Sequence, residues 1–416
     1  MTLQNSLLRP LPLVLALQLA LSSSAWAASF AVPANGSDSS TKTLTSGDTG
    51  SIASGASLTG NSSAADINVT GTSGTVTINN NGSLSNSSSG RAIDNDSSGV
   101  AISLNNNGSI STVSGDAVRL NKANSTLNLN NNGSIIVTGN GTSGGQALDL
   151  RGSSGTGAKV INNGSNSNRN ALIESRNDDA LRPGTNTTIN NYGSILSSGS
   201  VNTKCPDYLG AACSGKPSAH DAIDAGSRNG LVVNNWGSIS GARHGITADN
   251  ELTVTNQLGG LIIGRNGSGV GSDGTGTVIN YGTISGRYAG AGLAFDHLAD
   301  GSSTVNNGDG DGVDIDGIAT VDNYGRIEGL GAGGLDSGGA PNGADGIAAG
   351  GGTISNRAGA VISGQSKGIL IDDGANGTAV ASGRGTTTAT AGVANISNAG
   401  SIIGEQKTAI GLVGNF

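Results

Sequence analysis

Residues 233–239, VNNWGSI, decide the fold of this chain because their pattern recurs along almost the whole sequence. The pattern reads apolar, any residue, Asn, any residue, Gly, any residue, apolar. The same frame occupies residues 78–84, 104–110, 129–135, 189–195, 278–284, 321–327 and 396–402. Looser copies occupy residues 160–166, 254–262 and 354–362, the last two with a two-residue insertion around the Gly. A repeat of this period has to be explained before any single residue is.

The frame asparagines set the spacing of the repeat. Most of their intervals are 21 to 33 residues, and three are 42 to 44. We expect each long interval to contain two units, one of which has lost its signature. The frame asparagines are Asn80, Asn106, Asn131, Asn162, Asn191, Asn235, Asn256, Asn280, Asn323, Asn356 and Asn398.

A second, weaker signature precedes the frame by roughly ten to twenty residues. It is a small residue followed by an aliphatic one, as in Ala92-Ile93, Ala171-Leu172 and Ala222-Ile223. Each unit therefore offers two or three short strands, which cannot bury a face alone but can stack as coils. The pattern predicts an all-β fold, a parallel β-helix of eleven to fifteen coils and on the order of 55–70 Å. We expect Asn and Gly to supply left-handed corners, and stacked Asn side chains to form amide ladders.

The composition fits such a fold. The chain has 416 residues with 72 Gly, 2% aromatic and 12% charged residues, too few large side chains for an ordinary globular core. Val and Ile nevertheless recur at regular positions, which favours order over disorder. The net charge of −8 argues against nucleic-acid binding, which needs a basic surface.

The start of the chain reads as a secretory signal peptide. Arg9 precedes the apolar run of residues 11–21, and Ala25-Trp26-Ala27 is a small-x-small cleavage site. We expect cleavage after Ala27 or Ala28, because the apolar run is too short to cross a bilayer. The predicted parts are a signal peptide over residues 1–27, an N-terminal cap or first coils over 28–70, and β-helix repeats over 71–416.

Cys205 and Cys213 are the only cysteines. In an oxidising compartment we expect a local disulfide that closes a small loop. A catalytic cysteine and a zinc site are both disfavoured, because His220, His244 and His297 show no matching spacing.

The repeat units resemble a known family. Segments such as VDNYGRIEG, VINYGTISG and VNNWGSISG, together with GDGDGVDIDG and ISNRAGAVISG, look like the passenger region of Gram-negative autotransporters, the self-secreting type V proteins. The resemblance implies a right-handed parallel β-helix shown on, or shed from, the outer membrane. It also implies an outer-membrane translocator barrel as partner in the full-length protein. Since no such barrel pattern occurs here, we expect the chain to be a fragment or truncated product.

The residue between the frame Asn and Gly changes along the chain. It is Asn81, Asn107, Asn132 and Asn163 in the first four units, and later Tyr192, Trp236, Gln257, Tyr281 and Tyr324. The aromatics recur every 43 to 45 residues, which predicts one ring on every second coil at ~9.6 Å intervals. They either shield a corner or form a stripe that stacks on sugar rings.

The strongest acidic cluster is Asp309, Asp311, Asp314 and Asp316. Its start resembles half of a calcium loop, but the twelfth position is Ile318 instead of Glu. A solvated acidic turn and a calcium site remain the two readings.

A broken carboxylate row follows the second signature. Asp94, Asp149, Asp224 and Asp314 share this place, while Arg119, Ile173, Thr247 and Ala348 interrupt it. Adjacent carboxylates could serve a polysaccharide hydrolase, but the interruptions disfavour adjacency.

The sequence predicts no catalytic, cofactor-binding or metal site. We expect a non-enzymatic, adhesin-like surface rod that is secreted or displayed and contacts a host surface or glycan. The alternatives are a secreted polysaccharide-active β-helix enzyme, or a stalk for a missing domain.

Overall fold

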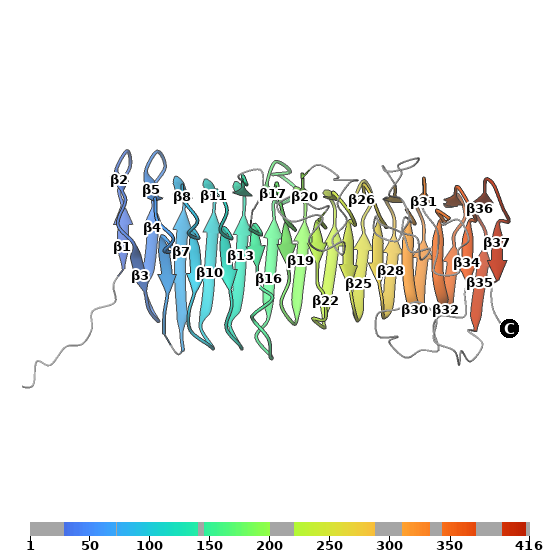
Figure 1. The fold of residues 1–416 in the computed structure, drawn as a ribbon, viewed down its shortest axis with the longest axis horizontal. Helices are drawn as coiled ribbons and strands as arrows, with labels where there is room; N and C mark the ends of the chain where they lie inside the picture. The colour runs from blue at the N-terminus through green and yellow to red at the C-terminus, as the bar shows by residue number, and fades with distance from the viewer. Residues whose placement is uncertain are drawn as a thin grey trace, which may run out of the picture.

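The computed structural model describes residues 29–71, 73–139, 145–199, 220–287, 310–332, 343–371 and 393–412, and every regular element among them is a β-strand. The strands form thirteen coils stacked in chain order along one axis (Figure 1). Each strand pairs in parallel with the equivalent strands of the neighbouring coils. The predicted parallel β-helix is confirmed. Twelve steps of ~4.8 Å give a stack of about 58 Å, within the predicted length.

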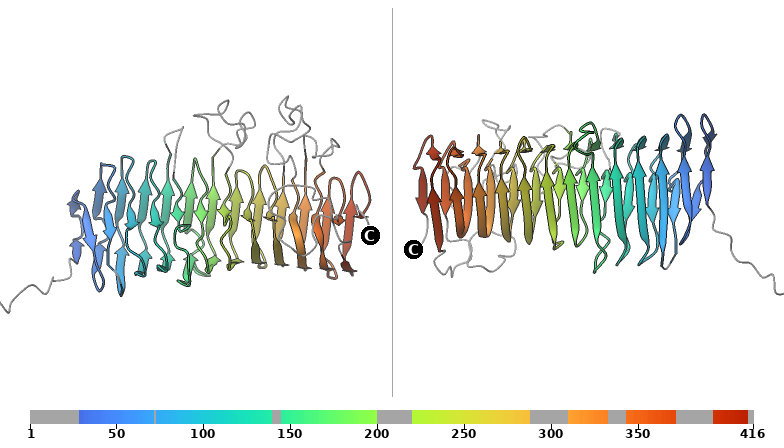
Figure 2. Two further views of the ribbon diagram at one scale, coloured as in Figure 1. Left: turned by 60° about the horizontal axis from the view of Figure 1, so that its bottom comes forward. Right: turned by 180° about the vertical axis from the view of Figure 1, so that it is seen from behind.

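Each coil has three strand segments, which make three faces that run the length of the rod (Figure 2). The continuous strands β30 and β32 each supply two of these segments. The long face carries the strands that lead into the Asn-Gly frame: β1(Phe30–Val32), β4(Thr49–Ile52), β7(Thr75–Asn80), β10(Ala101–Asn106), β13(Thr126–Asn131), β16(Lys159–Asn163), β19(Thr187–Asn191), β22(Leu231–Asn235), β25(Glu251–Asn256), β28(Thr275–Asn280), β30(Val313–Asn323), β32(Ile347–Asn356) and β35(Ala394–Asn398).

The second face carries the strands that follow the frame Gly: β2(Ser37–Asp38), β5(Ser57–Gly60), β8(Ser83–Asn86), β11(Ser109–Thr112), β14(Ser134–Val137), β17(Leu172–Ser175), β20(Ser194–Ser197), β23(Ser238–Gly241), β26(Leu261–Gly264), β29(Thr283–Gly286), β31(Arg326–Gly329), β33(Val361–Gly364) and β36(Ser401–Gly404). The third face carries β3(Lys42–Leu44), β6(Ile67–Val69), β9(Ile93–Asn95), β12(Val118–Leu120), β15(Leu148–Asp149), β18(Leu181–Arg182), β21(Ile223–Asp224), β24(Ile246–Ala248), β27(Val270–Ser272), the starts of β30 and β32, β34(Ile369–Ile371) and β37(Ile410–Leu412).

The core is a set of aliphatic columns. Val233 and Ile239 are fully buried, and each lies in register with an aliphatic residue of the next coil, Val254 and Ile262. Alternate residues point outward, so the strands show the two-residue burial period expected of half-buried β-strands. A narrow coil has room for Val, Ile and Leu, which explains why the core needs no aromatic side chain.

The frame asparagines form a continuous amide ladder inside the rod, as predicted. The Nδ2 of each donates to Oδ1 of its counterpart on the next coil at 2.7–2.9 Å. We call these residues the inner ladder: Asn80, Asn106, Asn131, Asn163, Asn191, Asn235, Asn256, Asn280, Asn323, Asn356 and Asn398. The second N–H of a ladder amide donates to a backbone carbonyl of the next coil, as Asn235 does to Leu261 at 3.2 Å.

The ladder amides also accept from their own turns. Asn235 Oδ1 receives the N–H of Gly237 at 3.2 Å, besides the amide of Asn191 at 2.8 Å. Both donors and the acceptor of Asn235 are therefore satisfied although the residue is fully buried. A buried amide is costly only when it lacks partners, so this ladder stabilises the stack and fixes its register.

The ladder corrects two expectations about the repeat. The fourth unit enters the ladder through Asn163, not Asn162, because Gly164 follows Asn163 directly in the turn. The three long intervals are single coils, because Asn191 bonds directly to Asn235, Asn280 to Asn323 and Asn356 to Asn398. The extra residues are therefore insertions, and no lost unit lies between these asparagines.

The frame glycines serve two purposes. In the looser copies, Gly164, Gly259 and Gly359 have positive φ and are left-handed corners, as expected. The described frame glycines Gly108, Gly193 and Gly237 have no positive φ, so they are not left-handed corners. A Cβ on Gly237 would lie 2.1 Å from the carbonyl oxygen of Gly193 on the preceding coil. The coils approach so closely here that only a residue without a side chain fits.

The first coils lack the ladder. Val32 and Ile52 occupy its column in coils one and two, and the ladder begins at Asn80. Residues 29–70 pair in register with the following coils and thus belong to the stack. Cys205, Cys213 and the predicted signal peptide lie outside the described residues. No helix in the described ranges is long and apolar enough to cross a membrane.

Candidate functional site

The charged residues of the third face form an alternating column. Asp94, Arg119, Asp149, Arg182 and Asp224 occupy the same outward position on successive coils. Arg119 holds Asp94 with two bonds, Nε to Oδ1 at 2.8 Å and Nη2 to Oδ2 at 2.7 Å. The predicted carboxylate row is therefore interleaved with arginines, as Arg119 suggested.

One member of that row was placed wrongly from the sequence. Ile173 lies on β17 in the second face, and Arg182 on β18 takes the expected place. The pair Ala171-Leu172 has the small-aliphatic pattern that marks strands of the third face. In this coil, however, the turn after Gly164 is longer than usual, and the pair begins the second-face strand β17. Asp224 pairs with Thr247 and Asp314 with Ala348, as the sequence predicted for these interruptions.

A second column consists of buried carboxylates that cap the next coil. Asp179 Oδ1 accepts the N–H of Asp221 at 2.8 Å, and Asp221 Oδ1 accepts that of His244 at 2.9 Å. The Nδ1 of His244 accepts the N–H of Ser268 at 3.0 Å in the same way. This column was not predicted, although the sequence carries a signal for it. An Asp precedes the small-aliphatic pair at five places: Asp116, Asp179, Asp221, Asp311 and Asp345.

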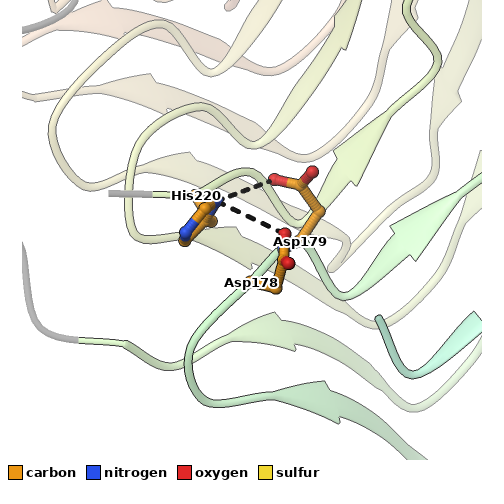
Figure 3. A group of neighbouring side chains, drawn as sticks. All are labelled: Asp178, Asp179 and His220. Carbon is orange, nitrogen blue, oxygen red and sulfur yellow. Dashed lines mark hydrogen bonds and ion pairs between the residues drawn. The ribbon is translucent and has the colours of Figure 1, made fainter. Parts of the chain in front are cut away.

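The two columns meet around Asp178, Asp179 and His220, the only group of three potential metal ligands found among the described residues (Figure 3). The aspartates lie in the corner between β17 and β18, and His220 precedes β21 on the next coil. His220 Nδ1 lies 3.5 Å from Asp178 Oδ1 and 3.6 Å from Asp179 Oδ1. Both carboxylates face the ring from one side in the figure.

Arginines neutralise this cluster. The Nε of Arg182 donates to Asp179 Oδ2 at 2.7 Å and its Nη2 to Asp178 Oδ1 at 3.0 Å. Arg243 of the next coil holds Asp221 through two bonds of 2.9 and 2.7 Å. The charges therefore tie three neighbouring coils together.

The pKa values in the cluster move in opposite directions. Burial raises the pKa of Asp179, but the hydrogen bond from His220 and the charge of Arg182 outweigh it, and the net pKa lies below the ordinary range. Burial and the charge of Asp179 raise the pKa of Asp178. Burial, with the charges of Asp179 and Asp221, raises the pKa of Asp224 to about 6. Such splitting follows when buried acids share a few cations.

The cluster could chemically do one of two things. Its three ligand atoms lie within 4.8 Å of one another, so Asp178, Asp179 and His220 are the residues that could hold a divalent cation. However, Arg182 and the Asp221 N–H already engage the carboxylate oxygens. The arrangement is that of an ion network which joins coils.

The aromatic residues of the frame lie in stacked pairs on adjacent coils, whereas one ring on every second coil was expected. Tyr192 and Trp236 occupy adjacent coils, with ring centroids 4.5 Å apart and planes within 3°. Tyr281 and Tyr324 stack in the same way at 4.6 Å, and Arg357 lies over the Tyr324 ring at 5.4 Å. The predicted spacing of every second coil was wrong within both pairs, because the 44- and 43-residue intervals are single coils. It holds between Trp236 and Tyr281, where the coil of Gln257 intervenes.

This stacking bears on the two readings of the aromatics. Within each pair one face of each ring is covered by its neighbour, and Arg357 covers a further face of Tyr324. Sugar stacking needs an exposed ring face, whereas shielding of a corner does not. Tyr281 and Tyr324 are nevertheless 39% and 43% exposed, so both roles fit the geometry.

The acidic cluster at 309–316 is divided by the structure. Asp309 lies outside the described residues, while Asp311 is buried in the capping column and accepts the N–H of Asp345. Asp314 and Asp316 lie two residues apart on the continuous strand β30. A calcium loop wraps its ligands around the ion, and an extended strand does not. Asp311 therefore belongs to the capping column, and Asp314 and Asp316 belong to strand β30, so these three residues do not form a calcium loop.

No protein-family model, no curated protein and no solved structure matches this chain.

Proposed function

We propose that this chain is the passenger region of a Gram-negative autotransporter, an adhesin-like rod without catalytic activity. It is exported through a signal peptide over residues 1–27 and displayed on the outer membrane or released. Its partners are an outer-membrane translocator in the full-length protein and a host-surface or glycan ligand.

The observation that carries the proposal is the unbroken register of the inner ladder over eleven coils, each bonded directly to the next. A stack held by such short-range contacts projects a surface far from its anchor without needing a globular core. The ladder continues without a break across its longest interval, because Asn191 bonds directly to Asn235. Loops on a rigid scaffold are where binding is usually carried.

A polysaccharide-active enzyme is less well supported. Such an enzyme needs two carboxyl groups that flank the scissile bond. In the described part of the third face, Arg119 and Arg182 alternate with the acids of the column. Arg119 pairs with Asp94 at 2.7 Å, and Arg182 lies 3.9 Å from Asp224. Nothing in the described ranges favours the stalk alternative over the adhesin.

The test is export and exposure in a Gram-negative host that carries the complete gene. We expect the exported chain to begin at Ala28 or Ser29 by N-terminal sequencing, and a tag in the exposed turn at Leu258 to be labelled on intact cells. Beads coated with the purified chain should bind host cells or matrix, and excess free chain should displace them. A chain that keeps Met1 and is labelled only after lysis would refute the proposal.

A further inference from the structure

A shallow groove lies on the outside of the rod near its N-terminal end. It encloses about 770 Å³ and runs from coil two to coil six, from Ser51 to Ser165. Its walls are the outward side chains next to the inner ladder on both sides. The groove is lined by amide and hydroxyl side chains and by Gly164, and no charged or aromatic residue lines it.

Two further asparagine columns build this groove. The outer column consists of Asn79, Asn105, Asn130, Asn162, Asn190 and Asn234, whose amides bond from coil to coil at 2.9–3.0 Å. The corner column contributes Asn81, Asn107 and Asn132, bonded at 2.8 and 3.0 Å. Both columns run opposite to the inner ladder, because each Nδ2 donates to the preceding coil.

These amides keep hydrogen-bonding capacity. Asn105 donates one N–H to Asn79 and accepts one from Asn130, which uses half of the donors of its amide. The corner asparagines are exposed to solvent, and the outer ones are half-buried. Each coil thus presents an outward N–H and C=O pair, repeated every ~4.8 Å.

We propose that this groove, the amide groove, binds a neutral polysaccharide. Amide donor and acceptor pairs match neighbouring sugar hydroxyls, and a repeating array matches a repeating polymer. An anionic chain would lose hydration without meeting a cation in the groove, which disfavours it. Four coil intervals give ~19 Å of contact, enough for several sugar units.

The groove ends where the corner column changes. Gly164 leaves the column without a side chain, and Tyr192 and the stacked Trp236 follow. The groove therefore ends at the coil where Gly164 replaces the corner Asn, although the outer column continues to Asn234. This inference deepens the proposed adhesin function and rests on it only for the extracellular source of the ligand.

The test uses two matched double variants of the full chain. Asn105→Ala/Asn130→Ala removes two amides inside the groove, and Asn190→Ala/Asn234→Ala removes two from the same column outside it. Binding is measured to a neutral glucan, mannan and galactan and to desialylated N-glycans, beside anionic heparin and polygalacturonate. Thermal unfolding shows whether the two variants lose equal stability.

We expect at least one neutral polymer to bind and the groove variant to weaken it roughly 25-fold, since each lost hydrogen bond contributes about a factor of five. The outside variant should bind like the parent. Comparison of the N-glycan arm with the glucan, mannan and galactan arms distinguishes a host glycoprotein glycan from a free polysaccharide as the source. Equal weakening by both variants, binding only to the anionic polymers, or no binding to any polymer would overturn the proposal. Purified-chain binding does not require display, so it can fail or succeed independently of export.

Discussion

The inner ladder predicts a large cost for losing a single asparagine in mid-rod. In the Asn235→Ala variant, the amide of Asn191 loses an acceptor and Oδ1 of Asn256 loses a donor. The carbonyl of Leu261 and the N–H of Gly237 lose their amide partners as well. Asn191 and Asn256 are fully buried, whereas Gly237 and Leu261 are half-buried. Water therefore does not replace the two lost amide–amide bonds without opening the stack.

The magnitude follows from this count. A hydrogen bond contributes about 1 kcal/mol, and an orphaned buried polar group costs about 1–3 kcal/mol. With partial relaxation, we expect Asn235→Ala to lower the free energy of unfolding by about 4 kcal/mol. The neighbouring Asn234→Ala is the matched control, because this half-buried residue makes one outer-column bond, to Asn190 at 3.0 Å. It should cost less than about 1 kcal/mol, since water can take the place of the lost partner.

The assay combines urea unfolding with hydrogen exchange. A stack of coils can open locally, so exchange of the backbone amides in β19, β22 and β25 reports the damage where it occurs. We expect these strands to lose protection in Asn235→Ala, while strands at the ends of the rod keep it. Equal effects of Asn235→Ala and Asn234→Ala would refute the ladder as a source of stability.

Three further predictions concern buried groups. Burial lowers the pKa of the fully buried Lys159 from 10.5 to about 8, so between these pH values the unfolded chain binds more protons than the folded one. The free energy of unfolding should therefore rise by up to about 3 kcal/mol from pH 8 to 10.5. Urea titrations should show this rise in the parent and not in Lys159→Met. Burial raises the pKa of Asp66 from 3.8 to about 7, so between these pH values the folded chain binds more protons than the unfolded one. The free energy of unfolding should therefore fall by up to about 4 kcal/mol as the pH rises from about 4 to 7. Asp66→Asn keeps the acceptor for Asn86, so it should be more stable than the parent at pH 8 and should not show this pH dependence. Gly237→Ala should destabilise by more than about 2 kcal/mol in thermal unfolding, because its Cβ meets the Gly193 carbonyl at 2.1 Å, whereas Gly259→Ala, with open space but positive φ, should cost about 1 kcal/mol.

Much of the fold was predictable because the repeat encodes it locally. The alternation around Asn235 identifies inward and outward positions, and stacking is the one arrangement that buries such short strands. The register was less predictable where insertions occur. Nothing in the sequence between Asn191 and Asn235 distinguishes a lost unit from a single coil, since the difference lies in which strands pair. The close approach of coils at Gly237 was not predicted, because contact between coils is a tertiary effect.

The site was less predictable than the fold. The interleaving of Arg119 with the acids could be read from the sequence, but Arg182 could not, because β17 and β18 both follow small-aliphatic pairs. The meeting of His220 with Asp178 and Asp179 depends on coil-to-coil contact across more than forty residues. The aromatic pairs were mispredicted for the same reason. Residues can be aligned into columns from the sequence only after the start and end of every coil have been assigned correctly.

The ladder requires that the coils of Asn191 and Asn235 stack directly on each other, although 44 residues separate them. An engineered disulfide tests whether these two coils are adjacent. With Cys205 and Cys213 replaced by Ser, we would compare Tyr192→Cys/Trp236→Cys with Tyr192→Cys/Gln257→Cys under mild oxidation. Adjacent coils place paired Cα atoms ~4.8 Å apart, within the range that a disulfide spans, and the second pair ~9.6 Å apart, beyond it. We expect near-complete cross-linking of the first pair and little of the second, measured by peptide mass after digestion. An uncross-linked first pair would place another coil between Asn191 and Asn235 and contradict the ladder as described.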